Sequence, residues 1–318
     1  MEKCPTYHIP VLLDASVSSL LTKPDGLYAD MTFGGGGHSR EILSRLSGSG
    51  HLYSFDQDAD AEQVAAQDFQ GQDRFTFVRS NFRYLRNWMR YYGVVDSEGR
   101  GGLDGVLADL GVSSHHFDTE ERGFSYRFDA PLDMRMNGRA GRTAADIVNQ
   151  AGEDDLARIL LLYGEVKQAR ALARQIVRQR QQAPILTTAQ LRDIVEPQGS
   201  TSAGRPGRSR GLLPQVFQAL RMEVNHEMEA LEAMLEASIA CLKPGGRLAV
   251  ITYHSLEDRM VKNIMRSGNV EGRIQQDFYG NRLSPIRPLS NKVITPGPEE
   301  QQQNPRSRSA KLRIAEIL

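Results

Sequence analysis

The chain has 318 residues, enough for one large domain with an insertion or for two domains. Its 39 lysines and arginines balance its 39 aspartates and glutamates, so the net charge favours no particular partner. Its two cysteines, Cys4 and Cys241, have no CxxC spacing, which excludes a disulfide framework or a cysteine-rich zinc site and fits a reducing compartment. No apolar run approaches the roughly 20 residues of a membrane span and the N-terminus does not open a signal peptide, so we expect a cytoplasmic protein without a membrane partner.

The first hundred residues alternate short apolar runs with helical patterns, which predicts a parallel sheet wrapped by helices. The expected strands of this part are Leu27–Phe33, His51–Asp56, Phe75–Val78 and Leu103–Leu110. The expected crossover helices between them are Ser39–Leu46 and Ala59–Gln67. The alternation then stops for about a hundred residues, in which the apolar spacing is helical. We expect a helical insertion there, with helices at Asp146–Tyr163, Val166–Gln182 and Thr188–Val195.

The sheet pattern resumes towards the C-terminus. Gly199–Gly211 has no apolar periodicity and is expected to be a mobile loop. An amphipathic pattern over Leu213–Cys241 predicts one long helix. A turn then leads into Arg247–Tyr253, an apolar run typical of a buried strand, and Lys311–Leu318 is expected to be the final strand.

Four consecutive glycines follow the first expected strand. Gly34–Gly37 removes side chains at a place where the backbone can approach a ligand closely. The next strand ends in Asp56, about twenty residues later, where a carboxylate can accept hydrogen bonds from both hydroxyls of a ribose. The pair predicts a nucleoside cofactor, either a nicotinamide cofactor or S-adenosylmethionine, although four glycines could also form only a flexible turn.

Two later features favour S-adenosylmethionine. The turn at Leu242–Gly246 ahead of an apolar strand is common in methyltransferases of this architecture and resembles nothing in dehydrogenases. Asp109 ends the fourth strand, and ligands of open α/β sheets bind beyond the carboxyl ends of the strands, so we expect Asp109 beside the reactive sulfonium. A carboxylate there can accept hydrogen bonds from a target amine, whereas the alternative is a capping or turn aspartate.

Longer blocks of the sequence resemble one family. The blocks are His8–Leu13, Thr32–Ser39, Asp109–Ser114, Arg122–Met136, Val216–Arg221, His254–Arg259 and Asn304–Ser309. Through them the chain resembles the bacterial 16S ribosomal RNA cytosine-N4 methyltransferases, the RsmH or MraW family, across nearly its whole length. The glycine loop alone is a weak signal, whereas the Arg122–Met136 block is highly specific.

The resemblance implies an α/β fold, a class I (Rossmann-like) methyltransferase sheet with an inserted all-helical domain. We expect residues 1–112 and 213–318 to form the S-adenosylmethionine-binding domain and residues 113–212 to recognise the RNA substrate. The family implies N4-methylation of a decoding-centre cytidine in the 16S ribosomal RNA of the small ribosomal subunit. The expected cofactor-binding residues are Gly34, Gly36, Gly37, His38, Asp56, Phe82 and Asp109. Where the family pattern has glutamine, this chain has His116, which can still donate or accept one hydrogen bond.

Asp109 is the expected catalytic residue. The N4 amine of cytosine is a poor nucleophile because its lone pair is delocalised into the ring, so a carboxylate that accepts its hydrogens and later its proton would assist the transfer. A target base outside its stack is usually gripped by an aromatic or apolar face. Phe124, Tyr126 and Phe128 are candidates on one face of an extended segment, although such a row also packs in cores. His254, just past a strand end, either faces the pocket or packs structurally.

One expected helix carries a basic face. Lys167, Arg170, Arg174 and Arg178 fall on one stripe of a helical wheel, opposite an apolar stripe. Basic residues also outnumber acidic ones over residues 166–210. Phosphates of ribosomal RNA are the obvious counter-charge, although a solvated face is the usual meaning of such a stripe.

Other functions are compatible with the same sheet. A small-molecule or DNA amino-methyltransferase would show the same cofactor motifs, and a scaffold protein could keep the fold without catalysis. The scaffold is disfavoured because Asp109 and the glycines are present. The seven histidines show no HxH or HExxH arrangement, so no metal is expected. The sequence is also compatible with a homodimer.

Overall fold

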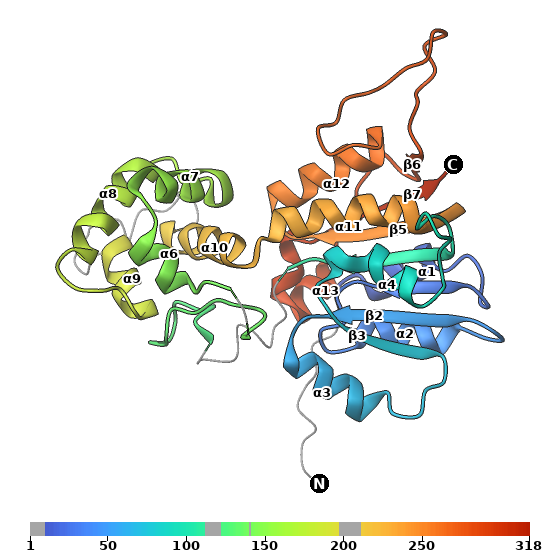
Figure 1. Cartoon of the computed structure of the whole chain (residues 1–318), viewed down its shortest axis with the longest axis horizontal. Helices are drawn as coiled ribbons and strands as arrows, with labels where there is room; N and C mark the ends of the chain where they lie inside the picture. The colour runs from blue at the N-terminus through green and yellow to red at the C-terminus, as the bar shows by residue number, and fades with distance from the viewer. Residues whose placement is uncertain (1–9, 112–121, 140, 197–210) are drawn as a thin grey trace. The chain divides into compact units, whose positions relative to one another are not determined.

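A computed structural model of the chain describes residues 10–111, 122–139, 141–196 and 211–318 (Figure 1). The chain divides into two compact units, a sheet unit of Met1–Gly111 with Met228–Leu318 and a helical unit of Val112–Glu227. The second segment of the sheet unit therefore begins at Met228 rather than at residue 213, the boundary expected from the sequence. The reason is that the helix after residue 211 buries its apolar face in the core of the helical unit.

A seven-stranded sheet in the order β3-β2-β1-β4-β5-β7-β6 forms the centre of the sheet unit. The strands are β1 (Leu27–Asp30), β2 (His51–Asp56), β3 (Phe75–Arg79), β4 (Leu103–Asp109), β5 (Leu242–Thr252), β6 (Ile286–Pro288) and β7 (Lys311–Ile317). Strands β1 to β5 are parallel, and β7 runs antiparallel to both β5 and β6. This order confirms the predicted class I (Rossmann-like) sheet, and it places β1 and β4, where the direction of winding reverses, side by side.

Helices cover both faces of this sheet. They are α1 (Leu13–Leu20), α2 (Gly37–Arg45), α3 (Ala59–Asp68), α4 (Leu85–Tyr91), α11 (Glu227–Cys241), α12 (Ser255–Ser267) and α13 (Pro298–Gln303), with single 3₁₀ turns at Phe82–Tyr84 and Pro305–Ser309. Of these, α1, α4, α12 and α13 were not predicted from the sequence. None of the helices in the described part of the chain combines the length and the apolar character that crossing a bilayer requires.

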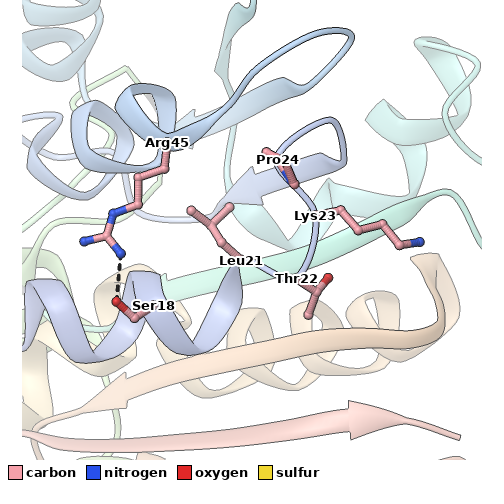
Figure 2. Close-up of a pocket in the computed structure, with 6 residues that line it drawn as sticks. All are labelled: Ser18, Leu21, Thr22, Lys23, Pro24 and Arg45. Carbon is pink, nitrogen blue, oxygen red and sulfur yellow. Dashed lines mark hydrogen bonds between the residues drawn. The ribbon is translucent and has the colours of Figure 1, made fainter.

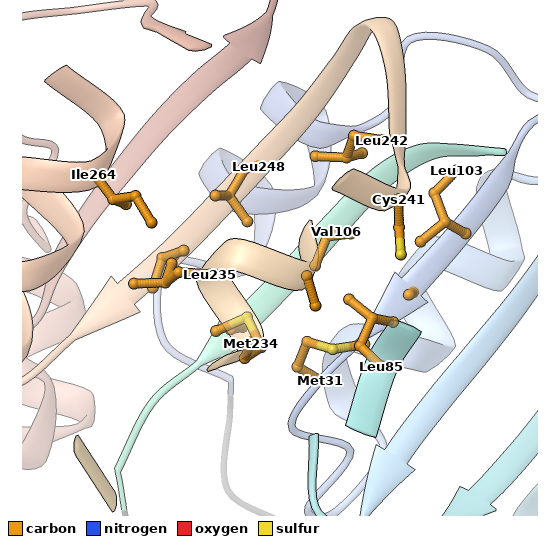
Figure 3. Packing of buried hydrophobic residues seen from close by; sticks show 14 of the residues in the cluster. Met31, Leu85, Leu103, Val106, Met234, Leu235, Cys241, Leu242, Leu248 and Ile264 are labelled. Carbon is orange, nitrogen blue, oxygen red and sulfur yellow. The ribbon is translucent and has the colours of Figure 1, made fainter. Parts of the chain in front are cut away.

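The two faces of the sheet build two separate cores, because successive side chains of a strand point to opposite sides. Val106 of β4 belongs to the same buried cluster as Leu85 of α4 and Ile264 of α12 (Figure 3). Its neighbour Leu107 packs on the other face, in the cluster that holds Leu20 of α1 and Ile42 of α2. A residue two positions after Leu107 therefore points to the side of α1 and α2.

The helical unit contains α6 (Ala144–Gln150), α7 (Glu153–Gly164), α8 (Ala169–Arg180), α9 (Thr188–Val195) and α10 (Leu212–Asn225). Two expected helices are each divided. The helix expected over Asp146–Tyr163 breaks at Gly152, which caps α7 with extended backbone just before three acidic residues that favour a helix N-terminus. The helix expected over Leu213–Cys241 breaks at His226, whose left-handed backbone (φ 49°) ends α10.

Candidate active site

The loops that follow β1, β2, β3 and β4 meet at the carboxyl edge of the sheet unit. Ligands of open α/β sheets bind at this edge, where the winding direction reverses. The glycine loop follows β1, Asp56 ends β2, Phe82 follows β3 and Asp109 ends β4. The structure therefore gathers the described residues predicted to bind the cofactor along one edge. His116 lies outside the described residues.

The glycine loop makes room mainly for the protein's own side chains. A Cβ atom at Gly36 would lie 2.8 Å from the ring of Phe69, and one at Gly37 would lie 2.1 Å from Cγ of Pro10. Both Gly34 and Gly36 also have positive φ angles (52° and 74°), which side chains disfavour. Of these three glycines, Gly34 is the one with open space, since a Cβ there would meet nothing closer than a backbone oxygen at 4.0 Å. The prediction that the loop clears a path for a ligand thus applies to its first glycine.

Asp56 is held in place by backbone donors. Its Oδ2 accepts the N–H of Gly34 at 2.9 Å, and its Oδ1 accepts the N–H of Asp58 at 2.9 Å. A carboxylate offers about four lone-pair sites, so two anchored oxygens can still accept ribose hydroxyls. Phe82 is half-buried in the single 3₁₀ turn that follows β3. A fixed carboxylate beside an open glycine fits a cofactor that carries a nucleoside.

Asp109 lies where the loops of β1 and β4 touch. Its backbone N–H donates to Oγ1 of Thr32 at 2.7 Å. Asp109 stands two positions after Leu107 and so points to the side of α2, where His38 lies in the first turn of the helix. Nδ1 of His38 is 3.8 Å from Oδ2 of Asp109, and the hydroxyl of Tyr253 donates to Oδ1 at 2.7 Å.

Burial raises the pKa of Asp109 to about 6, and the nearby His38 and the Tyr253 hydroxyl offset part of that effect. The side chain nevertheless keeps 22% of its surface exposed, so a substrate group can reach it. A carboxyl group that changes charge near neutral pH and remains accessible is suited to accept a proton. An exposed capping or turn aspartate would not have this pKa.

The sequence did not reveal the role of Asp30, a second carboxylate at this edge. Asp30 is 1% exposed, accepts the hydroxyl of Ser39 at 2.6 Å and accepts the N–H of Thr32 at 3.1 Å. Burial raises its pKa, and its charge in turn raises the pKa of Asp109. An aspartate at the end of an apolar strand was the available signal, since β1 otherwise has no charged residue.

Of the two histidines at this edge, His38 is buried and His254 is half-buried. The ring of His38 is turned towards Asp109, and its Nε2 lies 3.2 Å from the carbonyl oxygen of Val11. His254 precedes α12, and its Nε2 lies 2.8 Å from Oε1 of Glu257. Oε2 of the same glutamate accepts the N–H of Tyr253 at 3.0 Å. These contacts favour a structural role for His254 at the start of α12.

The three aromatic candidates for a base platform do not share one exposed face. Phe124 is 4% exposed and belongs to the core of the helical unit. Tyr126 packs edge-on against Phe217, with ring centroids 5.4 Å apart. Only Phe128, at 38% exposure, is open to a ligand. The alternative of core packing therefore holds for Phe124, and Tyr126 is half-buried against the same core, because this segment forms turns rather than the extended strand that was expected.

Three of the four predicted basic residues lie on α8, whereas Lys167 lies in the turn before the helix, which begins at Ala169 rather than at Val166. Lys167, Arg170, Arg174 and Arg178 are exposed, while the residues on the opposite stripe are buried. Arg174 is partly neutralised, because its Nε lies 3.2 Å from Oε1 of Glu153. Arg170 and Arg178 form no ion pair within the described residues. We call the four residues the α8 basic face.

A separate hollow in the sheet unit is lined by Ser18, Leu21, Thr22, Lys23, Pro24 and Arg45 (Figure 2). Nη1 of Arg45 donates to the hydroxyl of Ser18 at 2.7 Å across one side of it. Lys23 and Pro24 precede β1, so this hollow lies at the amino ends of the strands. It contains none of the predicted site residues and is not the candidate active site.

The chain is similar to a known family over almost its full length. A model described as the MraW methylase family matches residues 5–318. A ribosomal RNA small subunit methyltransferase H of Phocaeicola vulgatus is 59% identical over 310 residues, which cover 98% of this chain and 97% of that protein. Proteins with the same name from Bacteroides fragilis (59% over 315 residues, 99% of each chain) and Porphyromonas gingivalis (52% over 322 residues, 100% of this chain and 99% of that protein) are also similar.

Proposed function

The chain belongs to the MraW methylase family, and we propose that it transfers a methyl group from S-adenosylmethionine to N4 of a decoding-centre cytidine in small-subunit ribosomal RNA. The names of the relatives support small-subunit RNA as the substrate class. Asp109 is the observation that favours an amine as the methyl acceptor, because it is an accessible carboxyl group with a pKa of about 6 at the end of β4. Such a group suits a substrate that must lose a proton.

The proposed reaction requires the protein to hold the cofactor and to accept a proton from the target amine. When bound, S-adenosylmethionine supplies a sulfonium methyl group, so that an N4–C bond forms as the S–C bond breaks and its electron pair stays on sulfur. Asp109 accepts an N4 hydrogen, which favours the pyramidal amine over the conjugated one, and then takes the proton that N4 loses. Asp56 and the open Gly34 hold the nucleoside end, so the two carboxylates have separate tasks.

Mass spectrometry of small-subunit RNA tests this function directly. Cells that lack the gene should contain a small-subunit RNA without N4-methylcytidine, and purified protein with S-adenosylmethionine should restore it. Assays on isolated small subunits, free small-subunit RNA and DNA separate the proposal from the two other amino-methyltransferase functions. An unchanged N4-methylcytidine content in the deleted strain would refute the proposal, as would methylation of DNA alone.

We expect the α8 basic face to contribute to RNA affinity by neutralising phosphates. Arg170→Glu combined with Arg178→Glu should weaken binding to small-subunit RNA about ten-fold or more at moderate salt. The slope of log affinity against log salt should also fall by about one for each phosphate that is no longer neutralised. Filter binding across a salt series measures both quantities.

The control is Arg158→Glu on α7, an arginine of the same unit that lies only at the limit of an ion pair with Asp155 (4.0 Å). Arg174 is left unchanged, because reversing its charge would also break its hydrogen bond with Glu153. If the double variant and the control behave alike in affinity and in salt slope, the α8 basic face is only a solvated surface.

A further inference from the structure

We propose that Tyr253 is a positioning residue for Asp109, in that its hydroxyl fixes Oδ1, directs Oδ2 to the target amine and keeps the carboxylate ionised. The 2.7 Å hydrogen bond from the Tyr253 hydroxyl to Oδ1 is the observation behind it. The identity of the amine rests on the function proposed above, whereas the hydrogen bond is observed in the structure.

The other groups that face Asp109 cannot perform this task. Asp30 of β1 and Glu257 of α12 are acidic, and their charges raise the pKa of Asp109. His38 of α2 faces Oδ2, yet burial lowers the pKa of His38 below its usual value, which favours the neutral ring near neutral pH. Tyr253 is thus the only side chain in the described part of the chain that donates a hydrogen bond to this carboxylate.

The tautomer of His38 supports the same conclusion. The carbonyl oxygen of Val11, 3.2 Å from Nε2, can only accept a hydrogen bond, so the single proton of a neutral ring belongs on Nε2. Nδ1, 3.8 Å from Oδ2 of Asp109, is then an acceptor as well. Oδ2 and Nδ1 are then two neighbouring acceptors, which suits a donor such as an amino group. Only a protonated His38 would lower the pKa of Asp109 through its charge, and the neutral ring does not carry that charge.

Tyr253 is itself well fixed. It follows β5 on the same face as Leu107 and Asp109, and its N–H is held by Glu257. Its ring lies so close to Gly111 that a Cβ there would be 3.1 Å from Cδ2. Burial, Asp109, Glu257 and Glu300 together raise the pKa of the hydroxyl far above its usual value, so it stays protonated and remains a donor at any working pH.

Tyr253→Phe tests the proposal because it keeps the ring and removes only the donor. Without this hydrogen bond to the charged form, the pKa of Asp109 should rise, so the acid limb of the kcat–pH profile should move up by about one pH unit. This shift lowers the ionised fraction at pH 7 about two-fold, and the loss of the fixed orientation of the carboxylate should bring the total fall in kcat at pH 7 to about ten-fold or more. The Kd for S-adenosylmethionine should stay within about two-fold. Tyr53→Phe is the matched control, since no described residue forms a hydrogen bond with the Tyr53 hydroxyl.

A readout without turnover comes from NMR of the resting protein. With ¹³C-labelled aspartate, the carboxyl signal that disappears in Asp109→Asn reports the titration of Asp109. Its midpoint should move to higher pH in Tyr253→Phe and stay in place in Tyr53→Phe. A fluorotyrosine inserted at position 253 is a stronger donor that retains the ring, and it should move the midpoint to lower pH.

A midpoint that stays in place in both Tyr253 variants would overturn the proposal, as would a decrease in kcat that is equal at every pH. Because the titration needs no substrate, it also separates this inference from the proposed function. A shifted midpoint together with unmethylated small-subunit RNA would support the role of Tyr253 and refute the cytidine substrate.

Discussion

Asp109→Asn should lower kcat for methyl transfer by about a hundred-fold or more while leaving the Kd for S-adenosylmethionine within about two-fold. The amide oxygen can keep the hydrogen bond from the Tyr253 hydroxyl, which fixes the orientation of the new side chain. Its NH₂ group then occupies the position of Oδ2 beside Nδ1 of His38. The target amine would meet a donor where it needs an acceptor. Single-turnover transfer of a labelled methyl group and calorimetric cofactor titration measure the two quantities.

The same substitution should stabilise the protein. The pKa of Asp109 is raised to about 6 from 3.8, so the folded state binds this proton more tightly than the unfolded chain does. The charged carboxylate therefore costs stability above about pH 6, by at most about 3 kcal/mol, and this cost disappears as the pH falls towards 4. Replacing Asp109 with asparagine at pH 7.5 should raise Tm by roughly 5 °C and reduce the gain in stability between pH 7.5 and pH 5.

Asp104→Asn is the matched control at the other end of β4. Burial by itself would raise the pKa of Asp104. Hydrogen bonds from the Leu27 N–H and from Lys243 outweigh this effect and lower the pKa below its usual value. The charge of Asp104 is therefore stabilising, and its removal should lower Tm. If Tm falls in both variants, the charge of Asp109 stabilises the fold. Asp109 would then have a structural role, and the prediction that its charge is retained at a cost in stability would be wrong.

The sequence predicted the strand ends, and with them the residues that the structure brings together at the candidate site. Gly34, Asp56 and Asp109 each follow or end a buried strand, and parallel strands bring their carboxyl ends to one edge. Tyr253 was predicted only as the last residue of a strand, although its two-residue spacing from Ile251 places it on the face of Asp109. Seeing that Tyr253 reaches Asp109 requires knowing that β4 and β5 are neighbours, which a single sequence does not state.

The sequence failed where local signals competed with tertiary packing. Phe124 and Tyr126 alternate like strand residues, yet the segment folds as turns because both side chains are buried in or against the helical core. Gly152 and His226 interrupt two apolar patterns whose helical spacing continues on either side. Periodicity reports which face of a helix is buried, whereas the breaks depend on backbone conformations that periodicity does not contain.

Asp56→Ala should raise the Kd for S-adenosylmethionine about a hundred-fold. The variant loses the acceptors for the ribose hydroxyls, and hydrogen bonds to a charged group contribute about 1.5–3 kcal/mol each. It also releases the N–H groups of Gly34 and Asp58 that the carboxylate now holds, so the open end of the glycine loop loses its anchor. Asp56→Asn should be little better, because its NH₂ group would face one of these two N–H donors. Isothermal titration calorimetry measures the affinity.

Asp68→Ala is the control for this prediction, because Asp68 lies at the end of α3 in an exposed ion pair with Arg40 and should change the Kd by less than two-fold. An analogue of S-adenosylhomocysteine without the ribose 2′- and 3′-hydroxyls gives the decisive comparison. The wild-type protein should bind the analogue much more weakly than S-adenosylhomocysteine, whereas Asp56→Ala should hardly distinguish the two ligands. Equal discrimination by both proteins would mean that another group holds the ribose, and the cofactor would then have to lie elsewhere along the carboxyl edge.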